Sequence, residues 1–86
     1  PEPLFDGVFT VLNQRVVGGR HLKLSLRSAQ GGRVLDSIAF QQADVGPLPE
    51  GQQVRMVYRL DSNEYRGLLG LQLVVEFIQP LDDGSH

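Results

Sequence analysis

The clearest pattern in the chain is a strict alternation of apolar and polar positions. Every second residue is a leucine in one seven-residue run, His21-Leu22-Lys23-Leu24-Ser25-Leu26-Arg27. A period of two residues is typical of a β-strand with one buried face. We therefore expect a strand here whose leucines face a core and whose polar side chains face solvent.

A glycine pair, Gly18-Gly19, precedes this run and follows another strand-like segment. Glycine readily adopts the positive φ angles that a tight hairpin turn requires. The pair therefore predicts a hairpin whose first strand runs from about Phe5 to Val17. Because that strand is long, we expect a bulge or bend at Gly7 or Asn13 that lets it serve both edges of a closing barrel.

Three more strands follow in the pattern. A turn cluster at 28–32 introduces a third alternating run at 33–40, and a fourth run at 54–61 carries arginines at its outer positions. The segment 41–53 contains prolines, so we expect mainly a loop with a helix of at most a turn or two. We expect a further loop from Asp61 to Gly67.

The fifth run extends from Leu68 to Ile78, and Pro80 closes it. We expect Gln72 and Glu76 to face outward. The inward positions are expected to be Leu69, Leu71, Leu73, Val75 and Phe77.

Five strands arranged as a meander, a longer connection and a hairpin predict an all-β fold, a small Greek-key barrel of the OB type. An SH3-like barrel is the main alternative. The length of 86 residues allows one domain, which we place at residues 1–80, followed by a flexible polar tail at 81–86. Because Pro1-Glu2-Pro3 suits an interdomain linker, we expect a piece of a longer protein.

Charge is distributed unevenly along the chain. The net charge is −2, yet residues 7–35 contain five basic residues and no acidic one. One face of the domain can therefore be basic although the whole is acidic. No apolar run approaches the roughly 20 residues of a membrane helix, and no signal peptide is visible, so we expect a soluble cytoplasmic domain.

Catalytic chemistry has little support in this sequence. His21 and His86 are the only histidines, and cysteine is absent. A nucleophile, a base and an orienting group cannot be assembled from these residues, nor can a thiolate metal site. We expect neither a catalytic site nor a bound metal or other cofactor in this chain.

An OB-type barrel binds oligonucleotide strands across strands two and three and at the loops joining strands one to two and four to five. This geometry selects the candidate DNA-binding residues Arg15, Arg20, His21, Lys23, Arg27, Tyr65 and Arg66. Arg55 and Arg59 are second-rank candidates, because pairing with Glu76 across the last hairpin is the more common outcome. Tyr65 is the only aromatic expected to stack on bases. Most of the others are expected in the core, namely Phe9, Phe40, Tyr58 and Phe77.

Several segments resemble one family. They are Phe5-Asp6-Gly7, Arg15-Val16-Val17-Gly18 with His21-Leu22-Lys23-Leu24, and Asn63-Glu64-Tyr65-Arg66-Gly67 with Leu71-Gln72-Leu73. Together, from about Pro3 to Pro80, they resemble the OB-type domain of bacterial RecJ exonucleases. The resemblance implies a parent enzyme of DNA repair and recombination that degrades single-stranded DNA from its 5′ end. It also implies Mg or Mn ions held by Asp and His motifs that this chain lacks.

Two functions remain open. The first is an accessory domain that grips single-stranded DNA by backbone electrostatics. The second is an interaction module that docks the catalytic core or a single-strand-binding protein. An autonomous hydrolase is disfavoured because the catalytic groups are missing.

Overall fold

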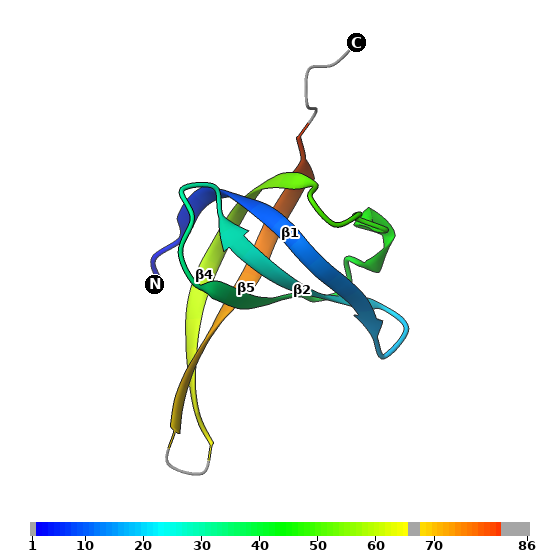
Figure 1. Ribbon diagram of the computed structural model, residues 1–86. Coiled ribbons are helices and arrows are strands. Elements are labelled where there is room, and N and C mark those ends of the chain that lie inside the picture. The colour runs from blue at the N-terminus through cyan, green and yellow to red at the C-terminus, as the bar shows by residue number, and fades with distance from the viewer. Residues whose placement is uncertain (1, 66–67, 82–86) are drawn as a thin grey trace.

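The chain forms five strands and one short helix in a computed structural model that describes residues 2–65 and 68–81, with side chains at 2–62 and 70–81 (Figure 1). The elements are β1 (Phe5–Val17), β2 (His21–Ser28), β3 (Val34–Ala39), the 3₁₀ helix η1 (Ala43–Val45), β4 (Gln53–Tyr65) and β5 (Leu68–Pro80). The strands close into a barrel in the order β1-β2-β3-β5-β4, and β4 pairs back onto β1. Only the β3–β5 pairing is parallel. The predicted five-stranded all-β barrel is confirmed.

β1 serves two neighbours, as its length predicted. Its first half pairs with β4 from Phe5 to Thr10, and its later part pairs with β2 from Phe9 to Val17. The register with β2 shifts between Val11 and Asn13, so the bulge predicted near Asn13 is confirmed. Such a bulge bends a strand and increases its twist, which allows β1 to close the barrel.

Three glycines of β1 and the turn after it are explained by backbone angle or by the space around them. Gly18 and Gly19 have φ angles of 63° and 74°, as the predicted hairpin turn requires. Gly7 has no register break. A Cβ atom built there would lie 3.1 Å from Cε1 of Phe9, so a larger residue would push that ring out of place.

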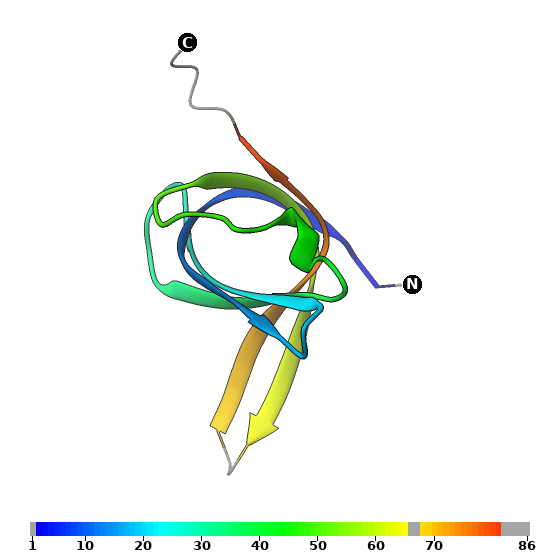
Figure 2. The same ribbon diagram turned by 90° about the vertical axis from the view of Figure 1, so that its right-hand side faces the viewer.

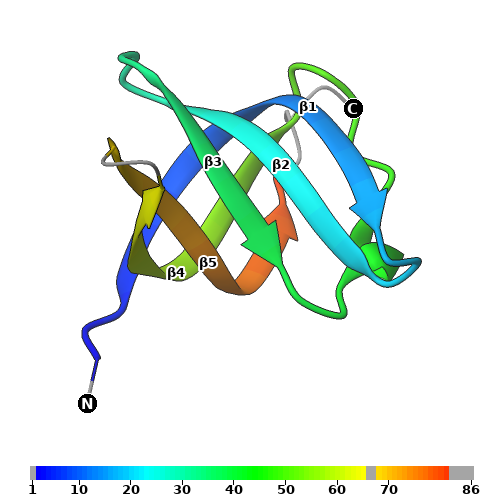
Figure 3. The ribbon, with the colours of Figure 1, turned by 90° about the horizontal axis from the view of Figure 1, so that it is seen from below.

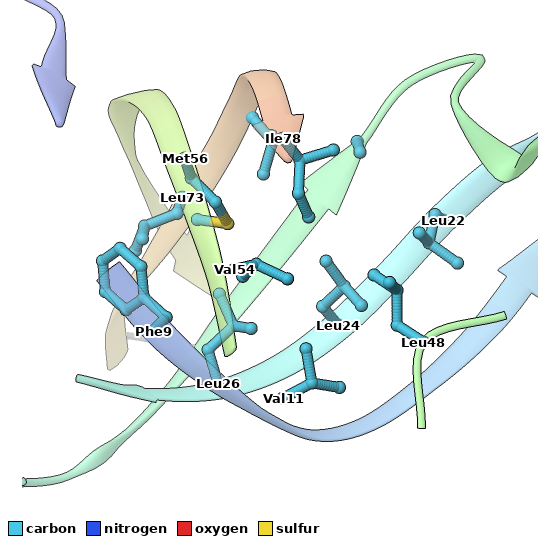
Figure 4. Packing of buried hydrophobic residues seen from close by; sticks show 12 residues of the cluster. Phe9, Val11, Leu22, Leu24, Leu26, Leu48, Val54, Met56, Leu73 and Ile78 are labelled. Carbon is cyan, nitrogen blue, oxygen red and sulfur yellow. The ribbon is translucent and has the colours of Figure 1, made fainter. Parts of the chain in front are cut away.

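The barrel interior is filled by alternating side chains from every strand (Figure 4). The predicted leucines of β2 are all buried, and Phe9 from β1 and Met56 from β4 pack with them. Ser37 is the buried polar residue among the described side chains, and its hydroxyl donates a hydrogen bond to the Leu24 carbonyl at 3.2 Å. That bond satisfies a group that would otherwise destabilise the core.

One end of the barrel is closed by the segment 40–52. Figure 2, which looks into the barrel, shows this segment and η1 across the opening. Leu48 is buried in the core, and its backbone N–H donates to Oε1 of Gln14 at 2.9 Å. The segment is a loop with a single short helical turn, as its prolines predicted.

The last hairpin differs from the prediction. β4 continues to Tyr65 and pairs with β5 up to Leu68, so the loop predicted from Asp61 to Gly67 is wrong for residues 61–65, and residues 66–67 lie outside the described part of the chain. Figures 1 and 2 show these two strands projecting well beyond the barrel. Leu71 was predicted to face inward but is exposed, because this part of the hairpin has no barrel interior to fill.

The alternation in β5 also changes phase. Leu73 and Val75 are buried as predicted, but Phe77 is exposed and Ile78 is buried in its place. Val57 pairs with Phe77 whereas the next residue of β4 pairs with Val75, which leaves one extra residue, Glu76, in β5. A bulge of one residue moves every later side chain to the opposite face. The side chain of Leu69 lies outside the described residues.

Phe40 was also predicted in the core, and this is wrong. Its side chain is 51% exposed, because Leu35, Ser37 and Ala39 take the inward phase of β3 and Phe40 continues the outward one. Phe9 is buried as predicted, and Tyr58 packs partly buried against the core. Where the chain is described, no helix is long and apolar enough to cross a membrane.

Candidate nucleic-acid interface

The outer faces of β1, β2 and β3 form one continuous surface. Lys23 on β2 stands between Arg15 on β1 and Ile38 on β3, and Ser25 stands between Asn13 and Asp36. Alternation places Arg27 on the same side of β2 as Lys23. We call this surface the basic face and define it by Asn13, Arg15, Lys23, Ser25 and Arg27.

A hollow of about 160 Å³ lies in the middle of the basic face. The lining comes from β1, β2 and β3, and Asp36 is its only carboxylate. The residues are Asn13, Arg15, Lys23, Leu24, Ser25 and Asp36. The hollow therefore offers two cations and several neutral hydrogen-bonding groups to a ligand.

The cations of this surface have no carboxylate partner among the described side chains. The ion pairs of residues 2–62 and 70–81 involve Arg55 and Arg59 only. Arg15, Lys23 and Arg27 thus lie more than 4 Å from any described carboxylate oxygen. No carboxylate among the described side chains neutralises their positive charge.

The second-rank arginines behave differently. Nε of Arg59 lies 3.4 Å from Glu76, and its guanidinium also reaches Glu2 at 3.8 Å. Arg55 lies 3.9 Å from Asp6. Both arginines are on β4, which pairs with β1 and β5 but not with β2 or β3, so the structure does not bring them onto the basic face.

His21 and Arg20 lie at the end of the basic face beside the β1–β2 turn. Nδ1 of His21 accepts a hydrogen bond from the Gln41 backbone N–H at 3.0 Å, and its ring meets that of Phe40 at 77° with centroids 5.3 Å apart. Arg20 is exposed, and its backbone carbonyl accepts a hydrogen bond from Ala43 at 3.1 Å. The turn is therefore tied to the segment that closes the barrel.

Two hairpins flank this region. Figure 3 shows β2 and β3 in front, the β1–β2 turn on the right and the ends of β4 and β5 on the left. Tyr65 ends β4, but its side chain and the whole of Arg66 lie outside the described residues. The two candidates on the second hairpin therefore stay predictions.

Metal-ligating side chains are scattered over the described part of the domain. Among the side chains that the structure describes, no group of three or more His, Asp or Glu residues lies together. These residues do not offer the several oxygen ligands that a Mg or Mn site requires.

Sequence reasoning missed Phe40 as a surface residue. The signal was present, because Phe40 shares its alternation phase with Asp36, and a carboxylate in that phase marks the solvent side of a strand. The aromatic character of Phe40 concealed this. Its position beside His21 places a flat apolar ring at the edge of the basic face.

A closed barrel with the order β1-β2-β3-β5-β4, whose β2–β3 face lies between two hairpins, defines an OB-type domain. A family model described as the RecJ OB domain matches residues 1–76. The chain therefore belongs to the RecJ OB domain family.

Known proteins agree with this assignment. The chain is 45% identical over 86 residues to the single-stranded-DNA-specific exonuclease RecJ of Haemophilus influenzae, covering 96% of this chain and 15% of that protein. A crystal structure of RecJ with Mg²⁺ from Thermus thermophilus matches with a TM-score of 0.66 at 26% identity, over 95% of this chain and 12% of that one. The chain thus spans about 15% of the length of the curated relatives it matches.

The fold also occurs in a separate protein. The mitochondrial single-stranded DNA-binding protein Rim1 of S. cerevisiae matches with a TM-score of 0.71 at 20% identity, over 98% of this chain and 99% of Rim1. At that identity the likeness concerns the fold alone.

Proposed function

We propose that this domain binds single-stranded DNA on its basic face and holds it for a nuclease active site elsewhere in a bacterial, cytoplasmic parent protein. The observation that carries the proposal is the set of cations along β1 and β2 that have no ion-pair partner among the described side chains. Arg15, Lys23 and Arg27 stand on the face that OB-type barrels use for ligands, and Arg20 stands at its end. The names of the relatives, which are single-stranded-DNA-specific exonucleases, support the choice of ligand.

The mechanism follows from the kind of side chains present. Cations bind phosphates without regard to sequence, because every nucleotide carries the same charge. Lys23 and Arg27 are four residues apart on one strand, which corresponds to about 13 Å along β2. A single strand running along β2 could therefore place different phosphates on the two cations.

Hydrolysis belongs to another part of the parent protein in this proposal. The Mg or Mn ions that the resemblance implies would lie in that catalytic core. The role of this domain is then to raise the local concentration of substrate and to guide the strand.

The proposal is tested by titrating a fluorescently labelled oligo-dT with the domain and following anisotropy. We expect saturable binding at low salt that weakens as salt rises, and a loss of at least tenfold in affinity for Lys23→Glu and Arg27→Glu. Arg55→Glu is the matched control, because it makes the same change in net charge on β4, away from the basic face.

The outcomes separate clearly. Weakening in both basic-face variants and not in Arg55→Glu supports the basic face. No binding by the unaltered domain at low salt contradicts the proposal, and equal weakening in all three variants contradicts the location.

A second candidate is an interdomain contact, favoured by the end of the barrel opposite the 40–52 segment. A pocket of about 460 Å³ opens there beside Phe9, Leu35 and Tyr58. Phe5, 41% exposed, stacks on Tyr58 near this pocket. Such a surface suits the catalytic core of the parent or a single-strand-binding protein, and it becomes the leading function if the DNA titration fails.

A further inference from the structure

Phe40 is exposed although it is one of the few aromatic residues of the chain. Its side chain is 51% accessible, and it directly follows β3. A single exposed apolar side chain is ordinary on a protein surface. The position of Phe40, and the way its neighbours hold it, distinguish it from the other exposed phenylalanines.

The first distinguishing feature is its place next to the cations. Alternation puts Phe40 and Ile38 on the outer side of β3, and His21 and Lys23 on the outer side of β2. His21 and Lys23 are two residues apart, which is about 7 Å along the strand. The Phe40–His21 pair therefore lies one row beyond the Arg15–Lys23 pair on the same continuous surface.

The second feature is that the ring pair is held in place without a ligand. Gln41 has a φ angle of 57°, which is uncommon for a residue other than glycine and turns the chain sharply after Phe40. In this conformation the Gln41 backbone N–H donates to Nδ1 of His21 at 3.0 Å. That bond fixes the His21 ring, which in turn packs edge-to-face with Phe40 at 77°.

The third feature is the chemistry that the combination provides. Single-stranded nucleic acids are bound by cations that follow the phosphates and by aromatic rings on which bases stack. The basic face supplies the cations, and Phe40 is the exposed aromatic ring beside them. A ring already held by a neighbour loses little freedom when a base stacks on it, which favours binding.

We propose that Phe40, positioned by His21, is a base-stacking subsite for the single strand whose phosphates contact Arg15 and Lys23. This inference rests on the proposed function and adds a contact with the bases to the contacts with the backbone. The ligand class is a single-stranded nucleic acid with intact bases. No preference among bases is expected, since every base has a flat face.

The test compares two labelled oligonucleotides of the same length, oligo-dT and an analogue whose sugars carry no bases. We expect Phe40→Leu to weaken oligo-dT binding about fivefold to tenfold, the lower part of the range for one stacked base, and to leave binding of the abasic analogue unchanged. Phe5→Leu is the matched control, because Phe5 is an exposed phenylalanine at the opposite end of β1 from the turn beside Phe40.

A direct optical readout is available because the chain contains no tryptophan. In Phe40→Trp, we expect tryptophan fluorescence to be quenched when oligo-dT saturates the domain. Saturation with the abasic analogue should leave the fluorescence unchanged. In Phe5→Trp, we expect no quenching with either oligonucleotide. Phe40→Trp keeps a large aromatic ring at the site and so also controls for any loss of folding in Phe40→Leu.

The outcomes distinguish this inference from the proposed function. If the unaltered domain binds both oligonucleotides equally and Phe40→Leu changes neither, stacking at Phe40 is overturned while binding by cations stands. If the unaltered domain binds neither at low salt, the proposed function fails and the subsite with it. If Phe40→Leu weakens binding of oligo-dT but not of the abasic analogue, and oligo-dT quenches the fluorescence of Phe40→Trp, both the proposed function and the stacking subsite are supported.

Discussion

At the scale of single residues, Asp36 stands out on an otherwise basic surface. It faces Ser25 across β2 and β3 and lines the same hollow as Arg15 and Lys23. Its carboxylate has no ion-pair partner among the described side chains. A phosphate bound near Lys23 would therefore meet a repulsive charge, which limits the affinity of the site for DNA.

Removing that charge gives a prediction with a definite sign. Asp36→Asn should strengthen oligo-dT binding about twofold to fivefold at low salt, which corresponds to about 0.5–1 kcal/mol for one partly screened charge. Fluorescence anisotropy at two salt concentrations measures it, and the gain should shrink as salt rises. Glu50→Gln, an equal charge change on an exposed loop, should have little effect. Weaker binding in Asp36→Asn would show that the carboxylate itself contacts the ligand.

At the scale of elements, the segment 40–52 closes the barrel with almost no regular structure. Hydrogen bonds attach it to several strands: the Leu48 N–H donates to Gln14, Nε2 of Gln42 donates to the Val75 carbonyl at 3.3 Å, and the Gly51 N–H donates to the Val11 carbonyl at 2.8 Å. Gly46 belongs to the same arrangement, because a Cβ there would lie 3.0 Å from Oε1 of Gln14. Gln14, through its side chain, and Val11, through its backbone, are thus the two residues of β1 that anchor the segment.

Loss of the Gln14 anchor should be measurable. Gln14→Met keeps a similar size but leaves the Leu48 N–H without its acceptor, and we expect the free energy of unfolding to fall by about 1–3 kcal/mol. Denaturant unfolding followed by circular dichroism measures the change. Gln79→Met, at an exposed position of β5, should change it by less than about 0.5 kcal/mol. An unfolding free energy unchanged in Gln14→Met would mean that the loop is held by its other bonds.

The elements also show how far the sequence predicts this fold. The bounds of β1, the Gly18-Gly19 turn and the buried leucines of β2 follow from local patterns, because each depends on neighbours along the chain. The phase of β5 does not. Glu76 is an extra residue only relative to β4. The register between two paired strands cannot be recognised from the sequence of either strand alone.

The residues of the candidate site also fall into those that local sequence predicts and those that depend on strand pairing. Lys23 and Arg27 could be placed on an outer face from alternation alone, and pairing of Arg59 with Glu76 was anticipated. Phe40 could not be placed while its aromatic character was taken to mean burial. Its packing against His21 depends on the pairing of β2 with β3 and on the turn at Gln41, which become visible only in three dimensions.

At the scale of the whole molecule, the net charge of −2 conceals a division between two sides. The β4 residues Arg55 and Arg59 form ion pairs with Asp6, Glu2 and Glu76, whereas the cations of the basic face have no ion-pair partner among the described side chains. Binding of DNA should therefore depend on a local charge rather than on the overall one. This distinction is measurable through the release of counterions.

We expect a salt dependence that counts the cations involved. If Arg15, Arg20, Lys23 and Arg27 each contact one phosphate, the slope of log K against log salt concentration should be about −3 for a single strand. Lys23→Gln should reduce its magnitude by about 0.7. Anisotropy titrations at several salt concentrations give both slopes. An unchanged slope in Lys23→Gln would show that this side chain does not contact a phosphate.

The division of β1 between two partners also determines the order in which the domain can be completed during synthesis. Residues 5–8 pair with β4 alone, whose matching residues begin with Arg55 and end with Tyr58. On the ribosome, β1, β2 and β3 can assemble as a meander, but the leucines of β2 stay uncovered until β4 and β5 have emerged and been added. Long-range closure of this kind is slow compared with hairpin formation. The domain therefore becomes resistant to proteases only after β5 has left the ribosome, and its nascent chain exposes a strand edge until that moment.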